Sequence, residues 1–85
     1  MALPDIILQR GELLVTESSG SEIQFENNGG IFGQIEMVSD VSDNYGVGNY
    51  IWFNPEGAVL FKFDDISYSL ITVDKVLFIE NYSAP

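Results

Sequence analysis

The residues in this sequence that could carry out chemistry are mostly carboxylates, and the most suggestive pair is Asp64 and Asp65. Two neighbouring carboxylates could act as an acid–base pair or supply oxygen ligands to calcium. Adjacent residues on a strand, however, point to opposite faces of a sheet, and no EF-hand spacing surrounds this pair. Aspartate favours turns because its side chain bonds to nearby backbone groups. We therefore interpret Asp64 and Asp65 as a solvated turn.

The chain of 85 residues contains no histidine and no cysteine. This composition excludes Ser–His and Cys–His nucleophile pairs, rules out disulfides and removes the ligands that zinc prefers. Gly46 and Gly48 do not form a dinucleotide-binding fingerprint, because no strand–glycine–helix pattern surrounds them. We therefore expect no enzyme activity, no cofactor and no metal site. The lack of cysteine fits a reducing compartment.

Three basic residues stand against 13 acidic ones, which gives a formal net charge of -10. Binding to nucleic acids or to anionic lipids depends on basic side chains, so we expect neither partner. The sequence shows no signal-peptide pattern and no apolar run of about 18 residues, the length that a membrane helix needs. We expect a cytoplasmic protein. Several aromatic residues could form a base-stacking platform, but the acidity favours core packing for them: Tyr50, Trp52, Phe53, Phe61 and Phe63.

The stretch 46–54 is expected to form a central strand with which the flanking segments can pair. Its aromatic block at 50–53 follows a glycine turn and ends at a second turn at 55–57, which predicts a buried strand. Gly33, within another predicted strand, indicates a bulge or a close approach of two backbones. We find no helical periodicity with caps, so six or seven short strands predict one all-β domain over 1–85, a barrel or a sandwich. The other predicted strands are 12–16, 31–38, 58–63, 66–73 and 75–80, and the segment 6–8 suits an edge strand or a lead-in to the first strand.

Residues 17–30 are rich in Ser, Gly and Asn, which favour turns and loops. Ile23 and Phe25 are the two apolar residues within this polar stretch, separated by Gln24. One interpretation is a short hairpin strand with both side chains on its inner face. The other is a mobile loop that carries an apolar hook for a partner. The sequence pattern leaves both open.

Three segments together resemble the small co-chaperonins, the GroES type that caps a chaperonin ring. Gly33–Val38 resembles the family's Gly-x-Val-x-x-Val strand, and Val47–Asn54 resembles its Val-Gly-Asp-x-Val-x-Phe strand. Ser67–Glu80 resembles the closing strand pair, with an acidic turn and an apolar strand that ends in Glu. The segments follow the family order with near-family spacing over 33–80. The segment 39–45 between two of these strands is short, so we expect the family's roof hairpin to be absent. This divergence from the cellular pattern suits a phage-encoded member.

The resemblance implies a small irregular β-barrel of the co-chaperonin type, with a flexible loop near 17–30 that binds a GroEL-type chaperonin. The chaperonin-binding residues would be Ser21, Glu22, Ile23, Gln24 and Phe25. It also implies a homo-oligomer, a heptamer, in which terminal strands of neighbouring copies pair. Unpaired edges invite such association. The interface residues would be Ile6, Ile7, Leu8, Val76, Leu77, Phe78 and Ile79.

A structural protein with a small β-barrel, such as a virion decoration or assembly component, would explain the acidity and the β pattern equally well. The loop at 17–30 separates the two hypotheses. A cap needs this loop disordered when free and ordered when bound, whereas a structural module would keep it packed.

Overall fold

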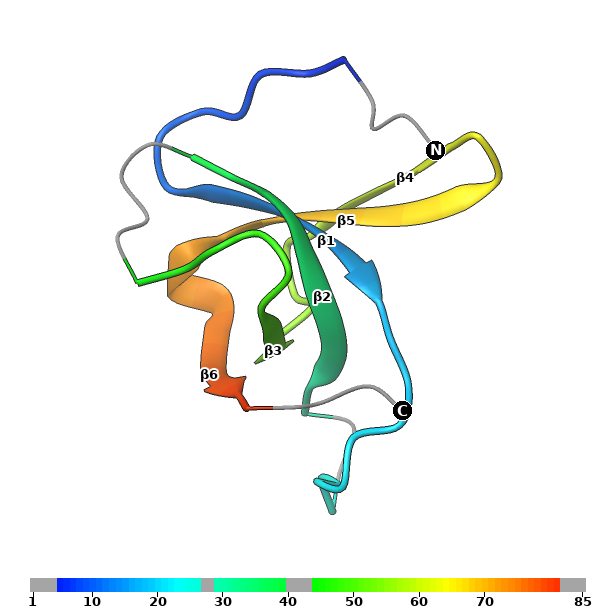
Figure 1. The fold of residues 1–85 in the computed structure, drawn as a ribbon, viewed down its shortest axis with the longest axis vertical. Helices are drawn as coiled ribbons and strands as arrows, with labels where there is room; N and C mark the ends of the chain where they lie inside the picture. Colours follow the sequence, from blue (N-terminus) through cyan, green and yellow to red (C-terminus); the bar gives the residue numbers. More distant parts are fainter. Residues whose placement is uncertain (1–4, 27–28, 40–43, 82–85) are drawn as a thin grey trace.

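The structure, a computed structural model, describes residues 5–26, 29–39 and 44–81, and its six strands form one antiparallel sheet (Figure 1). This confirms the all-β prediction. The strand order across the sheet is β4-β5-β1-β2-β3-β6. Four of the six strands differ by one residue at an end from the predicted ranges. The elements are β1 (Glu12–Glu17), β2 (Ile31–Val38), β3 (Tyr50–Phe53), β4 (Val59–Phe63), β5 (Ile66–Thr72), the 3-10 turn η1 (Val73–Lys75) and β6 (Val76–Glu80).

The main core cluster lies on one face of this sheet, which we call the inner face, and a smaller set of buried residues lies on the other face: Leu14, Phe32, Trp52 and Tyr68. Alternate residues of a strand point to opposite faces, so each strand places every second side chain there. Val15, Ile35 and Phe53 come from three neighbouring strands, and no part of these side chains reaches solvent. The buried core cluster comprises Leu13, Val15, Ile35, Ile51, Phe53 and Ile71.

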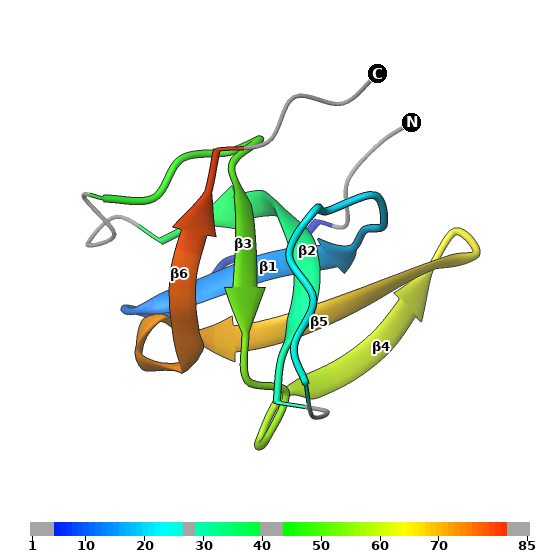
Figure 2. The same ribbon diagram turned by 90° about the horizontal axis from the view of Figure 1, so that it is seen from below.

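The sheet is strongly curved, so that β3 and β6 run across the direction of β1, β5 and β4 (Figure 2). This arrangement encloses the inner face, but the sheet is not closed into the small irregular β-barrel that the resemblance implies. Within the described residues, β4 pairs only with β5 and β6 pairs only with β3. The physical reason is that the hairpin of β4 and β5 extends outward, away from β6 (Figure 2). Each edge strand thus has one side without a partner strand among the residues that the structure describes.

Gly33 confirms the predicted close approach between backbones. A Cβ atom built on Gly33 would lie 2.5 Å from Cγ1 of Val15 and 2.7 Å from the carbonyl oxygen of Thr16. Neither distance leaves room for a carbon atom, so the pairing of β1 with β2 requires glycine here. The irregularity in the register falls instead at Glu36, because Leu14 pairs with Met37 while Val15 pairs with Ile35. Glu36 is therefore the extra residue of a β-bulge in β2.

The turn predicted at Asp64 and Asp65 is confirmed, since these two residues join β4 to β5 as a two-residue hairpin loop. Both adopt positive φ angles, 56° and 64°. Positive φ at both central residues is the pattern of a type I′ turn, whose twist matches that of the flanking strands. The turn is therefore structural, and the two carboxylates do not form a site.

Candidate functional site

The outer face of the sheet carries an aromatic cluster, formed by Phe32, Tyr50, Trp52 and Phe78. Register places these side chains together, because Phe32 pairs with Trp52 and Trp52 pairs with Phe78 across three neighbouring strands. The ring of Phe32 lies 5.4 Å from that of Tyr50 and 5.4 Å from that of Trp52, measured between centroids. Aromatic pairs at such separations stabilise beyond the area that they bury. We call this group the outer aromatic cluster.

The loop between β1 and β2 covers part of this cluster. Its described residues, 18–26 and 29–30, contain no strand, so the interpretation of Ile23 and Phe25 as an inner-face hairpin strand is wrong. Phe25 instead packs on the outer face, with its ring centroid 4.8 Å from that of Trp52 in an edge-on arrangement and 6.2 Å from that of Phe78. Asn27 and Asn28, which complete the predicted loop, lie outside the described residues.

Glu80, the last residue of β6, fastens the loop with its carboxylate. The hydroxyl of Ser21 donates a hydrogen bond of 2.5 Å to Oε1 of Glu80, and the indole N–H of Trp52 donates one of 2.8 Å to the same oxygen. The Ser21 oxygen also accepts the backbone N–H of Ile23 at 3.0 Å. Hydrogen bonds to a charged acceptor are stronger than those between neutral groups. One carboxylate oxygen thus joins the loop, the cluster and the edge strand.

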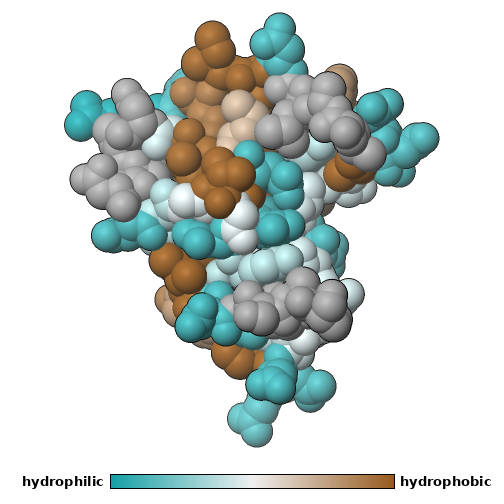
Figure 3. Space-filling model, in the orientation of Figure 1, coloured by the Kyte–Doolittle hydropathy of each residue, from teal (hydrophilic) through white to brown (hydrophobic). Residues whose placement is uncertain are grey.

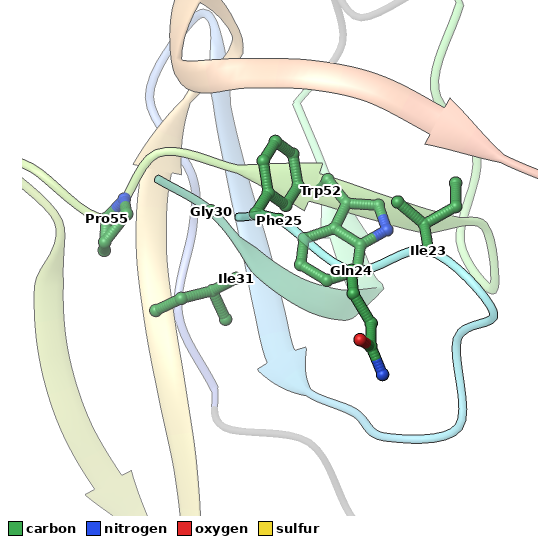
Figure 4. Close-up of a pocket in the computed structure, with 7 residues that line it drawn as sticks. All are labelled: Ile23, Gln24, Phe25, Gly30, Ile31, Trp52 and Pro55. Atoms are coloured by element: carbon green, nitrogen blue, oxygen red, sulfur yellow. The ribbon is translucent and has the colours of Figure 1, made fainter. Parts of the chain in front are cut away.

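A shallow depression of about 570 Å³ lies where the loop meets the outer face (Figure 4). Phe25 lies beside the Trp52 ring system, whereas the amide of Gln24 points away from it (Figure 4). Ile23 keeps 39% of its surface exposed. The lining is largely apolar, so the depression offers contact area rather than groups for catalysis. Its lining residues are Ile23, Gln24, Phe25, Gly30, Ile31, Trp52 and Pro55.

Gly30 helps to shape the place that Phe25 occupies. A Cβ atom on Gly30 would lie 3.1 Å from Cε2 of Phe25 and 3.1 Å from Cδ1 of Leu77. These separations are tight but not impossible, so a larger residue would push one of the two neighbours aside. Glycine at this position therefore allows Phe25 to lie close against the sheet.

The structure does not bring the two predicted interface segments together. Residues 6–8 have extended backbone outside any ladder, and 94% of the Ile7 surface is exposed. Val76 packs against the core cluster, whereas Leu77, Phe78 and Ile79 are exposed to between 38% and 45%. Hydrophobic surface gathers separately over the N-terminal segment and over β6 (Figure 3). The predicted interface residues therefore form two separate apolar surfaces in a single chain.

Of the predicted partner-binding residues, Ser21 and Phe25 are partly buried against Glu80 and Trp52, whereas Glu22, Ile23 and Gln24 are exposed. Sequence reasoning missed Glu80, and it assigned Trp52 only to core packing. The available signal was that Tyr50 and Trp52 alternate with Ile51 and Phe53, so that one pair must face away from the core.

Within the described ranges, no three His, Cys, Asp or Glu side chains gather in a way that could hold a metal ion. In the same ranges, no helix has the length and apolar character to cross a membrane. Comparison of the chain with models of known protein families gave no match. Comparison with curated proteins gave none either.

Proposed function

We propose that this chain is a co-chaperonin, a cap without catalysis of its own that binds a chaperonin ring in the cytoplasm through the loop between β1 and β2. The observation that carries the proposal is the exposed apolar side chain of Ile23 on that loop. The loop lies between the first two strands, as the resemblance implies. It reaches beyond the end of the sheet (Figure 1), where a partner has access to it.

The proposed assembly is a ring of seven copies. In it, the N-terminal segment at 6–8 of one copy, with its exposed Ile7, lies along the outer side of β6 in the next. The separation of these two apolar segments supports contacts between copies rather than within one. Contacts of this head-to-tail kind form a ring when the rotation between copies closes. Seven loops on one ring would bind together, so weak single contacts would add up to tight binding.

Chaperonin binding by single-site variants tests the proposed function. Ile23→Ser removes an exposed apolar side chain with little effect on folding, because Ile23 lies outside the core. A loss of about 1 kcal/mol for each loop would be about 7 kcal/mol over seven loops acting together, enough to abolish measurable binding. The matched control is Leu60→Ser, which removes an equally apolar side chain that is 72% exposed on β4. Normal binding by Ile23→Ser would contradict the proposal.

Native mass spectrometry of the purified chain tests the ring. We expect a sevenfold assembly, and we expect Ile7→Asp or Ile79→Asp to reduce it to single chains. Acidic side chains in the contact would oppose pairing between copies that each carry a formal charge of -10. A monomer, dimer or trimer of the unaltered chain would contradict the ring.

A structural role, as a virion decoration or assembly component, is the second candidate. The packing of Phe25 on Trp52 favours it, since a structural module is expected to keep this loop packed. The chaperonin-binding assay and native mass spectrometry together separate the two candidates. A stable assembly whose unaltered chain binds no chaperonin, and which Ile23→Ser leaves unchanged, would support the structural role.

A further inference from the structure

The loop that the proposed function assigns to a partner is bound to its own sheet. Phe25 lies against Trp52 and Phe78, and Ser21 donates a hydrogen bond to Glu80. A chaperonin that took Phe25 and Ile23 into its own groove would have to remove Phe25 from this position first. The internal contacts and the partner therefore compete for the same side chain.

We propose that these contacts form a loop latch, a docked state of the β1–β2 loop that opposes partner binding and opens before or during it. The latch residues are Ser21, Phe25, Trp52, Phe78 and Glu80. This inference rests on the proposed function, because only a partner for the loop gives the latch something to regulate. A ligand shifts such an equilibrium only through its different affinity for the two states, and here the partner binds only the open one.

The contacts that hold the latch are few. Phe25 is only partly buried, and Ile23 and Gln24 remain exposed. The side-chain hydrogen bond that ties the loop to the sheet is the one from Ser21 to Oε1 of Glu80, and the indole N–H of Trp52 holds the same oxygen in place. A loop held by so small a set can open without disturbing the inner core, since local openings cost far less than global unfolding.

Glu80 is the residue to change, because the hydrogen bonds from Ser21 and from Trp52 both end on it. Only chains with an open loop can bind the partner, so the apparent affinity is the intrinsic affinity multiplied by the open fraction. Weakening the latch raises that fraction and should therefore strengthen binding. Glu80→Ala removes the acceptor. Glu80→Gln keeps an acceptor oxygen without the charge and should have an intermediate effect. Ser21→Ala removes one donor from the loop itself and cannot disturb the sheet.

The first measurement uses the isolated chain. We expect Glu80→Ala to increase the rate of cleavage after Glu22 by a glutamate-specific protease by about tenfold, with a similar increase in hydrogen exchange at the Ile23 amide. Ser21→Ala should give a smaller increase in the cleavage rate, which is its readout, because the Ser21 hydroxyl also accepts the Ile23 N–H and its loss alone would speed exchange there. Glu56→Ala, at an exposed turn residue, is the matched control and should leave both rates unchanged. Equal rates in all four chains would overturn the latch and leave the proposed function standing.

The second measurement is the affinity of the same chains for a GroEL-type ring. If the latch opposes binding, Glu80→Ala should bind more tightly, by a factor no larger than its increase in loop exchange. Faster exchange without tighter binding would overturn the competition. No binding by any chain, including one with an open loop, would overturn the proposed function and the regulation that rests on it, while the first measurement would still decide whether the loop is latched.

Discussion

The inner and outer faces of the sheet are built from alternate residues of the same strands, yet they are covered in different ways. On the inner face, strands cover strands, and Val15, Ile35 and Phe53 are sealed from solvent. On the outer face, a loop covers Trp52 through the aromatic ring of Phe25 and is tied to Glu80 by one hydrogen bond from Ser21. The strands that bury the inner face cannot separate without unfolding the chain, whereas the β1–β2 loop can leave the outer face by itself. The comparison shows where stability and where switching can reside in one small sheet.

The largest loss of stability should follow from a cavity in the core on the inner face. Phe53→Ala leaves a cavity at a fully buried position and should cost about 4 kcal/mol, most of the stability of a domain of this size. Denaturation by urea, followed by circular dichroism, measures the loss. The outer-face comparison is Phe78→Ala, at a ring that is 38% exposed, which should cost about 1.5 kcal/mol. Equal losses for the two variants would contradict the distinction between the faces.

A smaller loss should follow from overpacking the inner face. Gly33→Ala places a methyl group against Val15 and the backbone of Thr16, where no space remains, and should cost about 2 kcal/mol. Gly46→Ala is a matched control, because its Cβ would meet only Oδ1 of Asn49 at an ordinary 3.5 Å. The difference between their urea midpoints measures the effect. If both changes are tolerated equally, β1 and β2 are not held as closely as described.

A loss confined to the outer face should follow from Trp52→Phe. This variant keeps an aromatic ring under Phe25 but removes the N–H that donates to Glu80, at a cost of about 1 kcal/mol. Hydrogen exchange should increase at the Ile23 amide and remain slow at buried amides such as that of Ile35. Faster exchange throughout the sheet would mean that the outer covering is part of the core after all.

The smallest effect should be a gain, at a place that belongs to neither face. Asp65→Gly removes the strain of a positive φ angle in the turn between β4 and β5 and should stabilise the chain by about 1 kcal/mol. The thermal midpoint should rise, and exchange at the Ile23 amide should not change. A change in loop exchange would show that the hairpin and the outer face are coupled.

The strand pattern could be predicted because it depends on local sequence. Alternation and turn residues located β3 and the turn at Asp64 and Asp65, and the absence of a side chain at Gly33 indicated the close approach. The position of Phe25 could not be predicted in this way. Ile23 and Phe25 share the two-residue spacing of a strand, but the positive φ angle of Gly20 and the bond from Ser21 to Glu80 hold the segment in a loop.

Two further features depended on contacts between distant parts of the chain. Ser21 and Glu80 are 59 positions apart, and no short-range pattern signals their bond. Closure of a sheet into a barrel depends on the tilt and stagger of all its strands together, which individual segments do not encode. The direction of the β4–β5 hairpin decides the matter here, and it leaves the sheet open.

Trp52 is the only tryptophan of the chain, and it lies directly beneath the loop. Indole emission moves to longer wavelengths when its surroundings become more polar. Opening the loop would remove Phe25 from the indole and bring water to it. Excitation at a wavelength selective for tryptophan would leave every other residue silent. The protein thus carries its own optical probe at the position that matters most. The wavelength of its fluorescence maximum would report the fraction of open loops in real time and without a label.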